Sequence, residues 1–451
     1  MSRRLFGTDG IRGVAGEFPL DGVTVFAIGR ALGHHLLRGS RRPKVVIGQD
    51  TRESSGWIAD AVAAGLASWA TEVSSAGVIT TPGVAYLARE LSFDAGVVVS
   101  ASHNPWIDNG IKVFGGDGYK LSDEVELSIE QEIFRLLEQG GSAQARPQAL
   151  PTLPGDHELR ERYETWLKNR ISSPKIKGKV VIDCANGAAS PVAMELFAML
   201  GLEAEFIHFS PNGRNINDHC GALYPQVVAD EVKRRHAVLG ITFDGDADRA
   251  LFADRNGKIV NGDAVLLLAA RDLQSRNELD AATIVATTMS NMGLEAALQR
   301  SGLKMLRAPV GDKYVLDEMR KSGAVLGGEQ SGHIIFSRIA TTGDGLLTAL
   351  IVLDILSRSG RQLEELVSDL EVFPQMIKNV RVREKQPLEK IANVTSAIRH
   401  AEKELAGTGR VVVRYSGTEP LARVMIEAQS KEQMERHVEA IAGAIQSSIG
   451  A

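Results

Sequence analysis

Short apolar runs alternate along this chain with longer segments in which apolar residues recur at helical spacing. Apolar runs at residues 45–48 and 97–99 lie on either side of such a segment, residues 57–69. Short apolar runs are typical of buried strands, and the longer period is typical of amphipathic helices. Their alternation predicts an α/β fold.

The same pattern contains a weak internal repeat. The sequence Lys-Val-Val-Ile occurs at residues 44–47 and again at 179–182, and Thr-Ile-Val-Ala-Thr at residues 283–287 is similar to both. Each copy has the composition of a buried strand, so the repeat indicates several related α/β units. A chain of 451 residues is also too long for one ordinary core, and domains of about 100 to 200 residues predict two to four of them.

Changes in composition predict where these domains meet. Residues 140–155 are rich in Gly, Ala, Gln and Pro, which is typical of an exposed connection and places a boundary near residue 152. A turn signal at residues 254–257 precedes a helix expected to begin near Asp263, so a second boundary is expected at residue 254. From residue 371 a β-α-β-β-α order predicts a separate α+β domain. Its expected elements are strands at 376–382, 411–413 and 424–426 and helices at 387–405 and 431–449.

Composition narrows the class of protein without identifying it. Apolar residues make up 44% of the chain, charged residues 24%, and the formal net charge is -5, which is ordinary for a globular protein and gives no sign of a nucleic-acid partner. Cys184 and Cys220 follow no metal-ligand or redox spacing and are expected to be buried reduced thiols. No apolar stretch reaches the roughly 18 residues that cross a bilayer, so a cytoplasmic protein without membrane contact is expected.

An acidic loop carries the strongest chemical signal. Asp244, Asp246 and Asp248 stand at alternate positions between two apolar runs, and such a cluster repels itself unless it holds a cation. Oxygen ligands in a short loop suit Mg²⁺, which commonly shares its shell with a phosphate. A calcium-binding EF-hand would need Gly and Glu where Arg249 and Arg255 stand. The remaining alternative is an acidic turn on the surface.

A hydroxyl and a lysine follow the strand predicted at residues 97–99. Ser102 and His103 come just after that strand, where site loops form in open α/β sheets, so Ser102 is a candidate nucleophile. The hydrolase frame G-x-S-x-G is absent. Lys112 is a candidate donor to a phosphoryl oxygen or a proton carrier. The alternatives are a turn or helix cap for Ser102 and a solvated charge for Lys112.

Two further loops offer groups that suit a phosphorylated sugar. Residues 327–333, Gly-Gly-Glu-Gln-Ser-Gly-His, surround Glu329 with small residues, and its carboxylate can accept hydrogen bonds from two neighbouring sugar hydroxyls. Near the C-terminus, guanidinium, hydroxyl and backbone N–H groups form the inventory of a phosphate nest. They belong to Arg414, Ser416, Gly417, Thr418 and Arg423. For both loops the alternative is an ordinary turn.

Taken together and in this order, the motifs resemble the α-D-phosphohexomutase superfamily over almost the whole chain. Residues 6–13, Phe-Gly-Thr-Asp-Gly-Ile-Arg-Gly, together with Gln330 and the Arg414 loop, are most similar to its bacterial amino-sugar branch. The resemblance implies three related α/β domains with mixed sheets and a C-terminal α+β domain of TATA-binding-protein-like fold around a central cleft. Its domains would span residues 1–152, 153–254, 255–370 and 371–451.

The resemblance also implies the reaction. It predicts an isomerase that interconverts glucosamine 6-phosphate and glucosamine 1-phosphate, on the route to UDP-N-acetylglucosamine and peptidoglycan precursors. Ser102 would carry a phosphoryl group and would join Asp244, Asp246 and Asp248 in holding one Mg²⁺ per chain. Glucosamine 1,6-bisphosphate would be the intermediate and activator, and the chain would be a homodimer.

Positions that match the family motifs receive individual roles. Arg249 would stabilise the transferring group, and Lys112 would act as acid or base, with His103, Arg12 and His333 as alternatives. The sugar would be bound by Glu329, Ser331 and His333, and the phosphate that is not reacting by Arg414, Ser416, Gly417, Thr418 and Arg423. Residues 308–313, Ala-Pro-Val-Gly-Asp-Lys, depart from the family pattern of Thr and a basic residue and leave the finer contacts open.

Three other functions use the same residues. Phosphomannomutase or phosphoglucomutase activity differs from the predicted activity by a few contacts at the second carbon of the sugar. A metal-dependent phosphatase would use the same serine and Mg²⁺, and would lose phosphate from the protein without substrate. A non-catalytic phosphosugar sensor would not require both an intact nucleophile and an intact metal loop.

Overall fold

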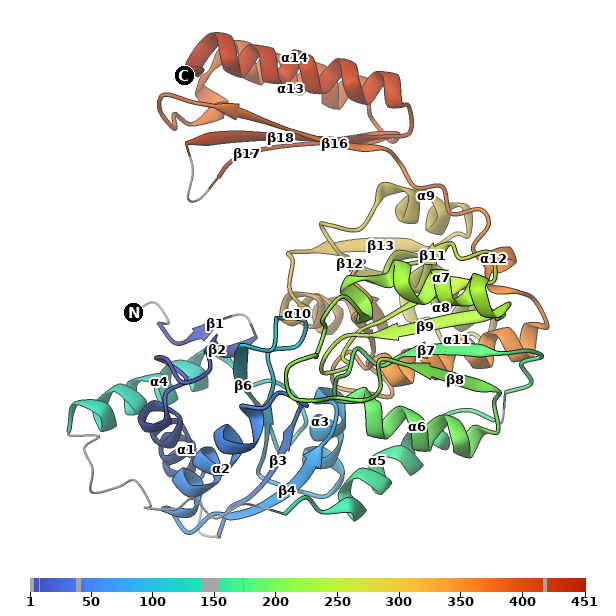
Figure 1. Cartoon of the computed structure of the whole chain (residues 1–451). Helices are drawn as coiled ribbons and strands as arrows, with labels where there is room; N and C mark the ends of the chain where they lie inside the picture. Colours follow the sequence, from blue (N-terminus) through green and yellow to red (C-terminus); the bar gives the residue numbers. More distant parts are fainter. Residues whose placement is uncertain (1–3, 8, 38–41, 140–153, 173, 417–419) are drawn as a thin grey trace. The chain divides into compact units, whose positions relative to one another are not determined.

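The computed structural model describes residues 4–7, 9–37, 42–139, 154–172, 174–416 and 420–451. Strands and helices alternate as predicted, and the α/β class is confirmed (Figure 1). The described chain forms two compact units, one with the residues up to Thr288 and Leu306–Val367, the other with Met289–Met305 and Ser368–Ala451. Most of the predicted connection at residues 140–155 lies outside the described residues.

The first sheet has the strand order β1-β2-β6-β5-β3-β4. It is covered by helices whose apolar faces build its core, with β5 buried along its whole length. Its strands are β1 (Phe6–Gly7), β2 (Gly10–Val14), β3 (Lys44–Gln49), β4 (Glu72–Val78), β5 (Ala95–Val99) and β6 (Asp108–Gly115). Its helices are α1 (Gly22–Leu36), α2 (Ser55–Ala67), α3 (Thr81–Glu90) and α4 (Asp123–Glu138).

The second sheet has the order β11-β10-β9-β7-β8. Val228, Ala229 and Val232 of its last helix pack on the strands around Val181 and Ala253. Its strands are β7 (Val180–Asp183), β8 (Ala204–Ile207), β9 (Leu239–Phe243), β10 (Ala250–Asp254) and β11 (Ile259–Val260). Its helices are α5 (His157–Lys168), α6 (Ala189–Leu200), the 3₁₀ turn η1 (Gly221–Leu223) and α7 (Pro225–Arg235).

The third sheet has the order β13-β12-β14-β15. Its strands are β12 (Thr283–Thr287), β13 (Lys304–Ala308), β14 (Leu326–Gly328) and β15 (Ile334–Phe336). The helices of this region are α8 (Gly262–Ser275), η2 (Asp280–Ala282), α9 (Met292–Arg300), α10 (Asp312–Ser322), α11 (Gly345–Ser359) and α12 (Leu363–Leu366). The helix expected near Asp263 is therefore α8, and the Asn261 side chain caps it by accepting a hydrogen bond from the Ala264 N–H.

The first, second and third sheets repeat one arrangement. Their orders β6-β5-β3-β4, β10-β9-β7-β8 and β15-β14-β12-β13 correspond strand by strand. In each repeat the first strand runs parallel to its inner neighbour, and the last two strands form an antiparallel hairpin. The repeated sequences at residues 44–47, 179–182 and 283–287 fall on the equivalent strands β3, β7 and β12. Related units are thus present, as the weak repeat indicated.

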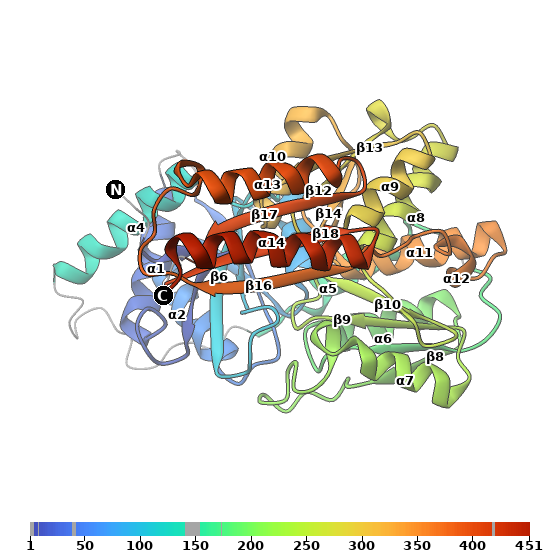
Figure 2. The same ribbon diagram turned by 90° about the horizontal axis from the view of Figure 1, so that it is seen from above.

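The C-terminal region has the predicted β-α-β-β-α order. Strands β16 (Gln375–Arg381), β18 (Leu421–Ala428) and β17 (Gly409–Tyr415) form the sheet, and α13 (Ala392–Glu404) and α14 (Lys431–Ile449) lie side by side on one face of it (Figure 2). The predicted helix at residues 387–405 was too long at its start. A 3₁₀ turn, η3 (Leu388–Lys390), comes first, and the extended backbone of Ile391 separates it from α13.

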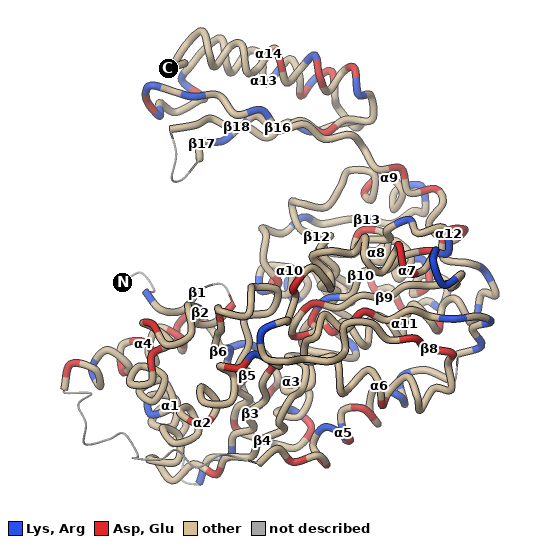
Figure 3. The backbone as a smooth tube through the Cα atoms, viewed as in Figure 1, with Lys and Arg blue, Asp and Glu red and all other residues tan. Residues whose placement is uncertain are grey.

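Charges and apolar side chains follow the expectations from composition. Basic and acidic positions are interspersed along the described chain (Figure 3). Cys184 and Cys220 are buried free thiols, as predicted. Within the described residues, none of the helices combines the length and apolar character needed to cross a membrane.

Candidate active site

The repeated hairpin places the site loops at corresponding positions. Residues 100–107 join β5 to β6, residues 244–249 join β9 to β10, and residues 329–333 join β14 to β15. Since each connection follows the carboxyl end of the same strand of the repeat, the serine, the acidic triad and Glu329 occupy equivalent places in the three sheets. The chemistry of each loop differs although its support is the same.

Hydrogen bonds at its hydroxyl and at its carbonyl hold Ser102 in place. Its backbone has φ 52°, in the left-handed region that serine rarely adopts, and its side chain is buried. The Ser102 hydroxyl donates a hydrogen bond to Asp244 Oδ2 at 2.6 Å. The Ser102 carbonyl accepts hydrogen bonds from Arg52 Nη2 at 3.1 Å and from Asn217 Nδ2 at 2.9 Å. Such an over-determined, strained position is typical of functional sites.

The acidic triad has the geometry of a cation site. Carboxylate oxygens of Asp244, Asp246 and Asp248 lie within 4.8 Å of one another, and all three residues are buried. Asp246 Oδ1 and Asp248 Oδ1 are buried oxygens without a hydrogen-bond partner among the described residues. Burial, and next the Asp248 and Asp246 carboxylates, raise the pKa of Asp244 well above its usual range. Hard oxygen donors in this state fit a divalent cation such as Mg²⁺, which would relieve both the repulsion and the missing contacts.

Lys112 lies against the triad. Its ammonium is 2.8 Å from Asp246 Oδ2 and 3.0 Å from Asp9 Oδ2, and its side chain is almost completely buried. Burial acts to lower the pKa of Lys112, but the Asp246 and Asp9 carboxylates outweigh burial and raise it. These carboxylates therefore favour the protonated form of Lys112, in which its ammonium can donate a proton.

A cavity of about 400 Å³ opens beside these groups. Several predicted site residues line it together, namely Arg12, His103, Asp248, Arg249, Glu329 and His333. His103 Nδ1 lies 3.4 Å from the Ser102 hydroxyl. Burial and, next, the Arg249 guanidinium lower the pKa of His103, which favours the neutral imidazole. This cavity has room for a small polar ligand and brings cationic, anionic and neutral groups to it.

The Glu329 loop faces the same cavity from the third sheet. Glu329 Oε1 accepts the Gly311 N–H at 3.1 Å, and Oε2 accepts the Ser331 hydroxyl at 3.3 Å. His333 Nε2 accepts the Gly343 N–H at 3.1 Å, which directs Nδ1 toward Asp248 at 3.5 Å. Ser331 therefore orients the carboxylate, while Glu329 and His333 both line the cavity.

The predicted phosphate-binding residues belong to the other compact unit. Arg414 on β17 and Arg423 on β18 are directly opposed across the two strands. Like charges at such a position are unfavourable unless an anion lies near them. Ser416 is buried and its carbonyl accepts a hydrogen bond from Lys385 Nζ at 2.7 Å. Gly417 and Thr418 lie outside the described residues.

Several residues at the site carry no local sequence signal. The Thr81 hydroxyl donates to Asp246 Oδ2 at 2.6 Å, because Thr80 caps α3 and Thr81 is the first residue of that helix. Arg52 and Asn217 donate hydrogen bonds to the Ser102 carbonyl, and Lys385 donates one to the Ser416 carbonyl. Asp9 did have a signal, since it lies within the motif at residues 6–13. Sequence patterns cannot reveal partners that lie far apart along the chain.

A second group of ligand-type atoms lies at the end of β7. Oxygen, nitrogen and sulfur atoms of Asp183, His208 and Cys220 are within 4.8 Å of one another. The Asp183 carboxylate, however, already accepts the N–H groups of Ala185 at 2.9 Å and Gly221 at 3.0 Å and pairs with His208. These contacts satisfy the buried Asp183 carboxylate. We therefore interpret the group as a structural contact that stabilises the loops around Asn217.

Family models match most of the chain. The models described as phosphoglucomutase/phosphomannomutase alpha/beta/alpha domains I, II and III match residues 3–140, 161–257 and 261–373. The model of the C-terminal domain of the same family matches residues 377–444. The four matches occur in the order in which the family domains are numbered.

Known proteins are similar to the chain over its full length. The phosphoglucosamine mutase of Koribacter versatilis is 62% identical, with 99% of this chain and 98% of that protein covered. The phosphoglucosamine mutase of Bacillus subtilis is 44% identical, with 99% of each covered. Among solved structures, a phosphoglucomutase/phosphomannomutase family protein from Burkholderia thailandensis is 25% identical with a TM-score of 0.78, covering 98% of this chain and 97% of that one. An Aspergillus fumigatus N-acetylphosphoglucosamine mutase, solved with GlcNAc-6P and magnesium, has 19% identity and a TM-score of 0.64, covers 99% and 96%, and shares the fold.

Proposed function

The chain belongs to the phosphoglucomutase/phosphomannomutase family, and from this premise we infer that it interconverts glucosamine 6-phosphate and glucosamine 1-phosphate. It is an isomerase of the phosphomutase type, acting on a phosphorylated amino sugar. The observation that carries the assignment to this site is the hydrogen bond from the buried Ser102 hydroxyl to Asp244, a member of a buried acidic triad that could hold a cation. A nucleophile beside a metal loop is the arrangement that phosphoryl transfer needs.

The proposed reaction begins from Ser102 in its phosphorylated form. The sugar hydroxyl attacks the phosphorus, the bond from phosphorus to Ser102 Oγ breaks, and the hydroxyl proton leaves to a base of the site. The product, glucosamine 1,6-bisphosphate, reorients and returns its other phosphoryl group to Ser102. The bisphosphate is therefore both intermediate and activator, since it also phosphorylates an unmodified serine.

Asp244, Asp246, Asp248 and Ser102 are the proposed ligands of one Mg²⁺ per chain. The ion, when bound, supplies positive charge beside the transferring phosphoryl group. Arg249 adds a second positive charge at the same cavity. Lys112 is the proposed acid–base residue, and Arg12 and His103 position the reacting groups beside Ser102.

Recognition of the sugar must work in two orientations. Glu329 and His333, oriented with Ser331, are proposed to bind hydroxyls that occupy similar places before and after the bisphosphate turns over. Arg414, Ser416, Gly417, Thr418 and Arg423 are proposed to bind the phosphate that is not reacting. Domains at residues 1–152, 153–254, 255–370 and 371–451 would divide these tasks. The protein is further proposed to be a cytoplasmic homodimer.

The mass of the intact protein tests this function directly. Purified protein is treated with glucosamine 1,6-bisphosphate and Mg²⁺, weighed, and assayed for glucosamine 1-phosphate formation from glucosamine 6-phosphate. The parent should gain one phosphoryl group and be active, whereas Ser102→Ala should gain none and be inactive. Ser275→Ala is the control, because it removes an exposed serine hydroxyl at the end of α8 and should still be phosphorylated at Ser102.

Two results would oppose the proposal. If Ser102→Ala kept both the phosphoryl group and the activity, the nucleophile would be another residue. If the parent lost its phosphoryl group rapidly without sugar, the protein would be a phosphatase. Parallel assays with glucose 6-phosphate and mannose 6-phosphate separate the amino-sugar activity from that of its nearest relatives.

A further inference from the structure

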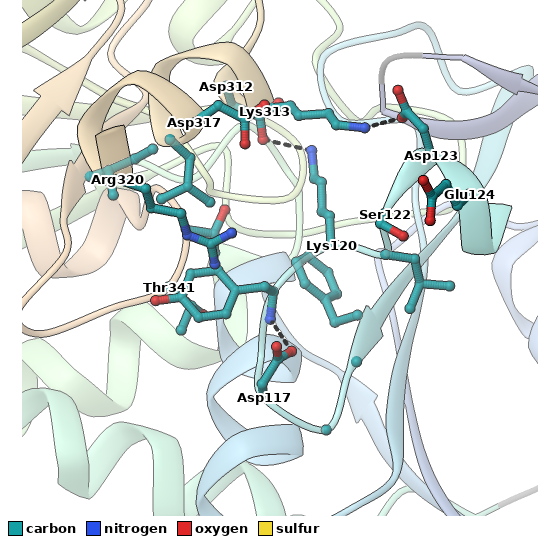
Figure 4. A pocket seen from close by; sticks show the side chains of 18 residues that line it. Asp117, Lys120, Ser122, Asp123, Glu124, Asp312, Lys313, Asp317, Arg320 and Thr341 are labelled. Carbon is teal, nitrogen blue, oxygen red and sulfur yellow. Dashed lines mark hydrogen bonds and ion pairs between the residues drawn. The ribbon is translucent and has the colours of Figure 1, made fainter. Parts of the chain in front are cut away.

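A second cavity, of about 760 Å³, lies next to the catalytic cavity and shares a wall with it. Asp312 lines both cavities, Lys120 lines only the second, and Asp9 lines only the catalytic one. Figure 4 shows Lys120 extended across this wall toward Asp312, with Lys313 and Asp123 paired at the rim of the second cavity. The wall between the cavities is therefore built from charged side chains.

Lys120 links two carboxylates in this wall. Its ammonium is 2.5 Å from Asp9 Oδ1 and 2.6 Å from Asp312 Oδ2. The three side chains are largely buried, with exposed fractions of 18% for Lys120, 22% for Asp9 and 16% for Asp312. Ion pairs withdrawn from water in this way hold their partners more firmly than pairs on the surface.

Asp9 transmits this link to the catalytic groups. Its other oxygen, Oδ2, is 3.0 Å from the Lys112 ammonium and also pairs with the Arg12 guanidinium. Each oxygen of Asp9 thus takes a different lysine, Lys120 on one side and Lys112 on the other. Lys112 in turn contacts Asp246 at 2.8 Å. The charges alternate without interruption from Asp312 to the acidic triad.

The linked residues come from three separate segments. Asp9 lies between β1 and β2, Lys120 follows β6 and bridges back to Phe114, and Asp312 is the first residue of α10. The backbone before Lys120 is fixed by a closed turn, in which the Gly115 N–H donates a hydrogen bond to the Tyr119 carbonyl at 2.8 Å. Lys120 can therefore hold the other two segments at a fixed distance from Lys112.

We propose that Lys120 is a positioning residue for phosphoryl transfer, fixing Asp9 so that Lys112 and Arg12 stay aligned with Ser102 and the acidic triad. This proposal rests on the phosphomutase function inferred above. Lys120 does not line the catalytic cavity, so its removal should disturb the transfer step more than substrate binding. Misplacing a catalytic group by about 1 Å lowers rates by roughly 100-fold.

The test compares three variants by steady-state kinetics with glucosamine 6-phosphate, bisphosphate and Mg²⁺. Lys120→Met should lower kcat by roughly 10- to 100-fold while KM changes less than about threefold. Lys120→Arg should restore kcat to within about threefold of the parent, because a guanidinium can span two carboxylates. Lys321→Met, which removes an exposed lysine near the end of α10, should leave both constants unchanged.

A failed positioning role must be distinguished from misfolding of a variant and from failure of the proposed function. Lys120→Met should lower the thermal unfolding midpoint, because it leaves two largely buried carboxylates without their shared cation, so all kinetics are measured well below the midpoint of each variant. Lys120→Gln replaces Lys120→Met if the latter does not fold. A kcat within threefold of the parent in Lys120→Met, or a loss that appears mainly in KM, overturns the positioning role. So does a Lys120→Arg variant that is no better than Lys120→Met. Absence of conversion by the parent itself would instead refute the underlying function.

Discussion

The β5–β6 connection and the β9–β10 connection occupy the same place in two repeats, yet they carry opposite chemistry. The first presents a serine hydroxyl and an imidazole, whereas the second presents three carboxylates. Both contain a non-glycine residue with positive φ, Ser102 at 52° and Ala247 at 56°. Each loop alone is incomplete, and the hydrogen bond from Ser102 to Asp244 joins them. The repeat thus supplies the scaffold, and the site arises where two differently equipped copies meet.

Neutralising the carboxylate that joins the loops should have the largest effect. Asp244→Asn removes a carboxylate that would hold the cation and weakens the acceptor of the Ser102 hydroxyl, so kcat/KM should fall by roughly 1000-fold, the range seen when an electrostatic stabiliser is lost. The measurement is kcat/KM over a series of Mg²⁺ concentrations, together with Mn²⁺ binding by calorimetry. Asp230→Asn, on the exposed face of α7, is the control for net charge. Normal metal binding and activity in Asp244→Asn would separate the triad from catalysis.

The close approach of the two loops is the next feature to break. A Cβ added to Gly245 would lie 2.5 Å from the Ser102 carbonyl oxygen and 2.8 Å from Asn217 Nδ2, so Gly245→Ala must push the acidic loop away from the serine. We expect kcat to fall by roughly 10- to 100-fold with little change in cation affinity. Gly56→Ala is the matched control, because nothing lies within 4 Å of its added Cβ. Unchanged kcat in Gly245→Ala would show that the loops tolerate separation.

These loops were visible in the sequence because their residues are contiguous. The α/β class, the repeated strands and the C-terminal order could all be predicted from apolar spacing, since strand and helix periods are local properties. The left-handed backbone of Ser102 could not, because serine disfavours that region and only tertiary contacts impose it. The same limit applies to charge partners. Lys112 and Asp246 are 134 residues apart, and Lys120 and Asp312 are 192 apart, so no spacing rule connects them.

A buried aspartate lies at the end of a strand in each of the two repeats, and the two aspartates differ in the side chain with which they pair. Asp50 and Asp183 are buried at the carboxyl ends of β3 and β7, and each accepts the N–H two residues further on, from Arg52 at 3.0 Å and Ala185 at 2.9 Å. Asp50 pairs with Arg52, whose charge is permanent, whereas Asp183 pairs with His208 at 3.1 Å. Of these two pairs, only Asp183–His208 should change its charge near neutral pH.

The smallest expected effect is a change in this pH response. The Asp183 carboxylate raises the pKa of His208, so the ion pair stabilises the fold fully below the unfolded pKa of about 6.5 and loses that contribution as pH rises through the folded pKa. The His208 side chain is 34% exposed, which limits the contribution to less than about 1 kcal/mol. His208→Asn, which tolerates the positive φ of this position, should flatten the fall of the thermal midpoint between about pH 6 and pH 9. His157→Asn is the control, because it removes only the exposed pair with Glu161, and it should retain the slope of the parent. A slope in His208→Asn equal to that of the parent would mean that the Asp183–His208 pair is as insensitive to pH as the Asp50–Arg52 pair.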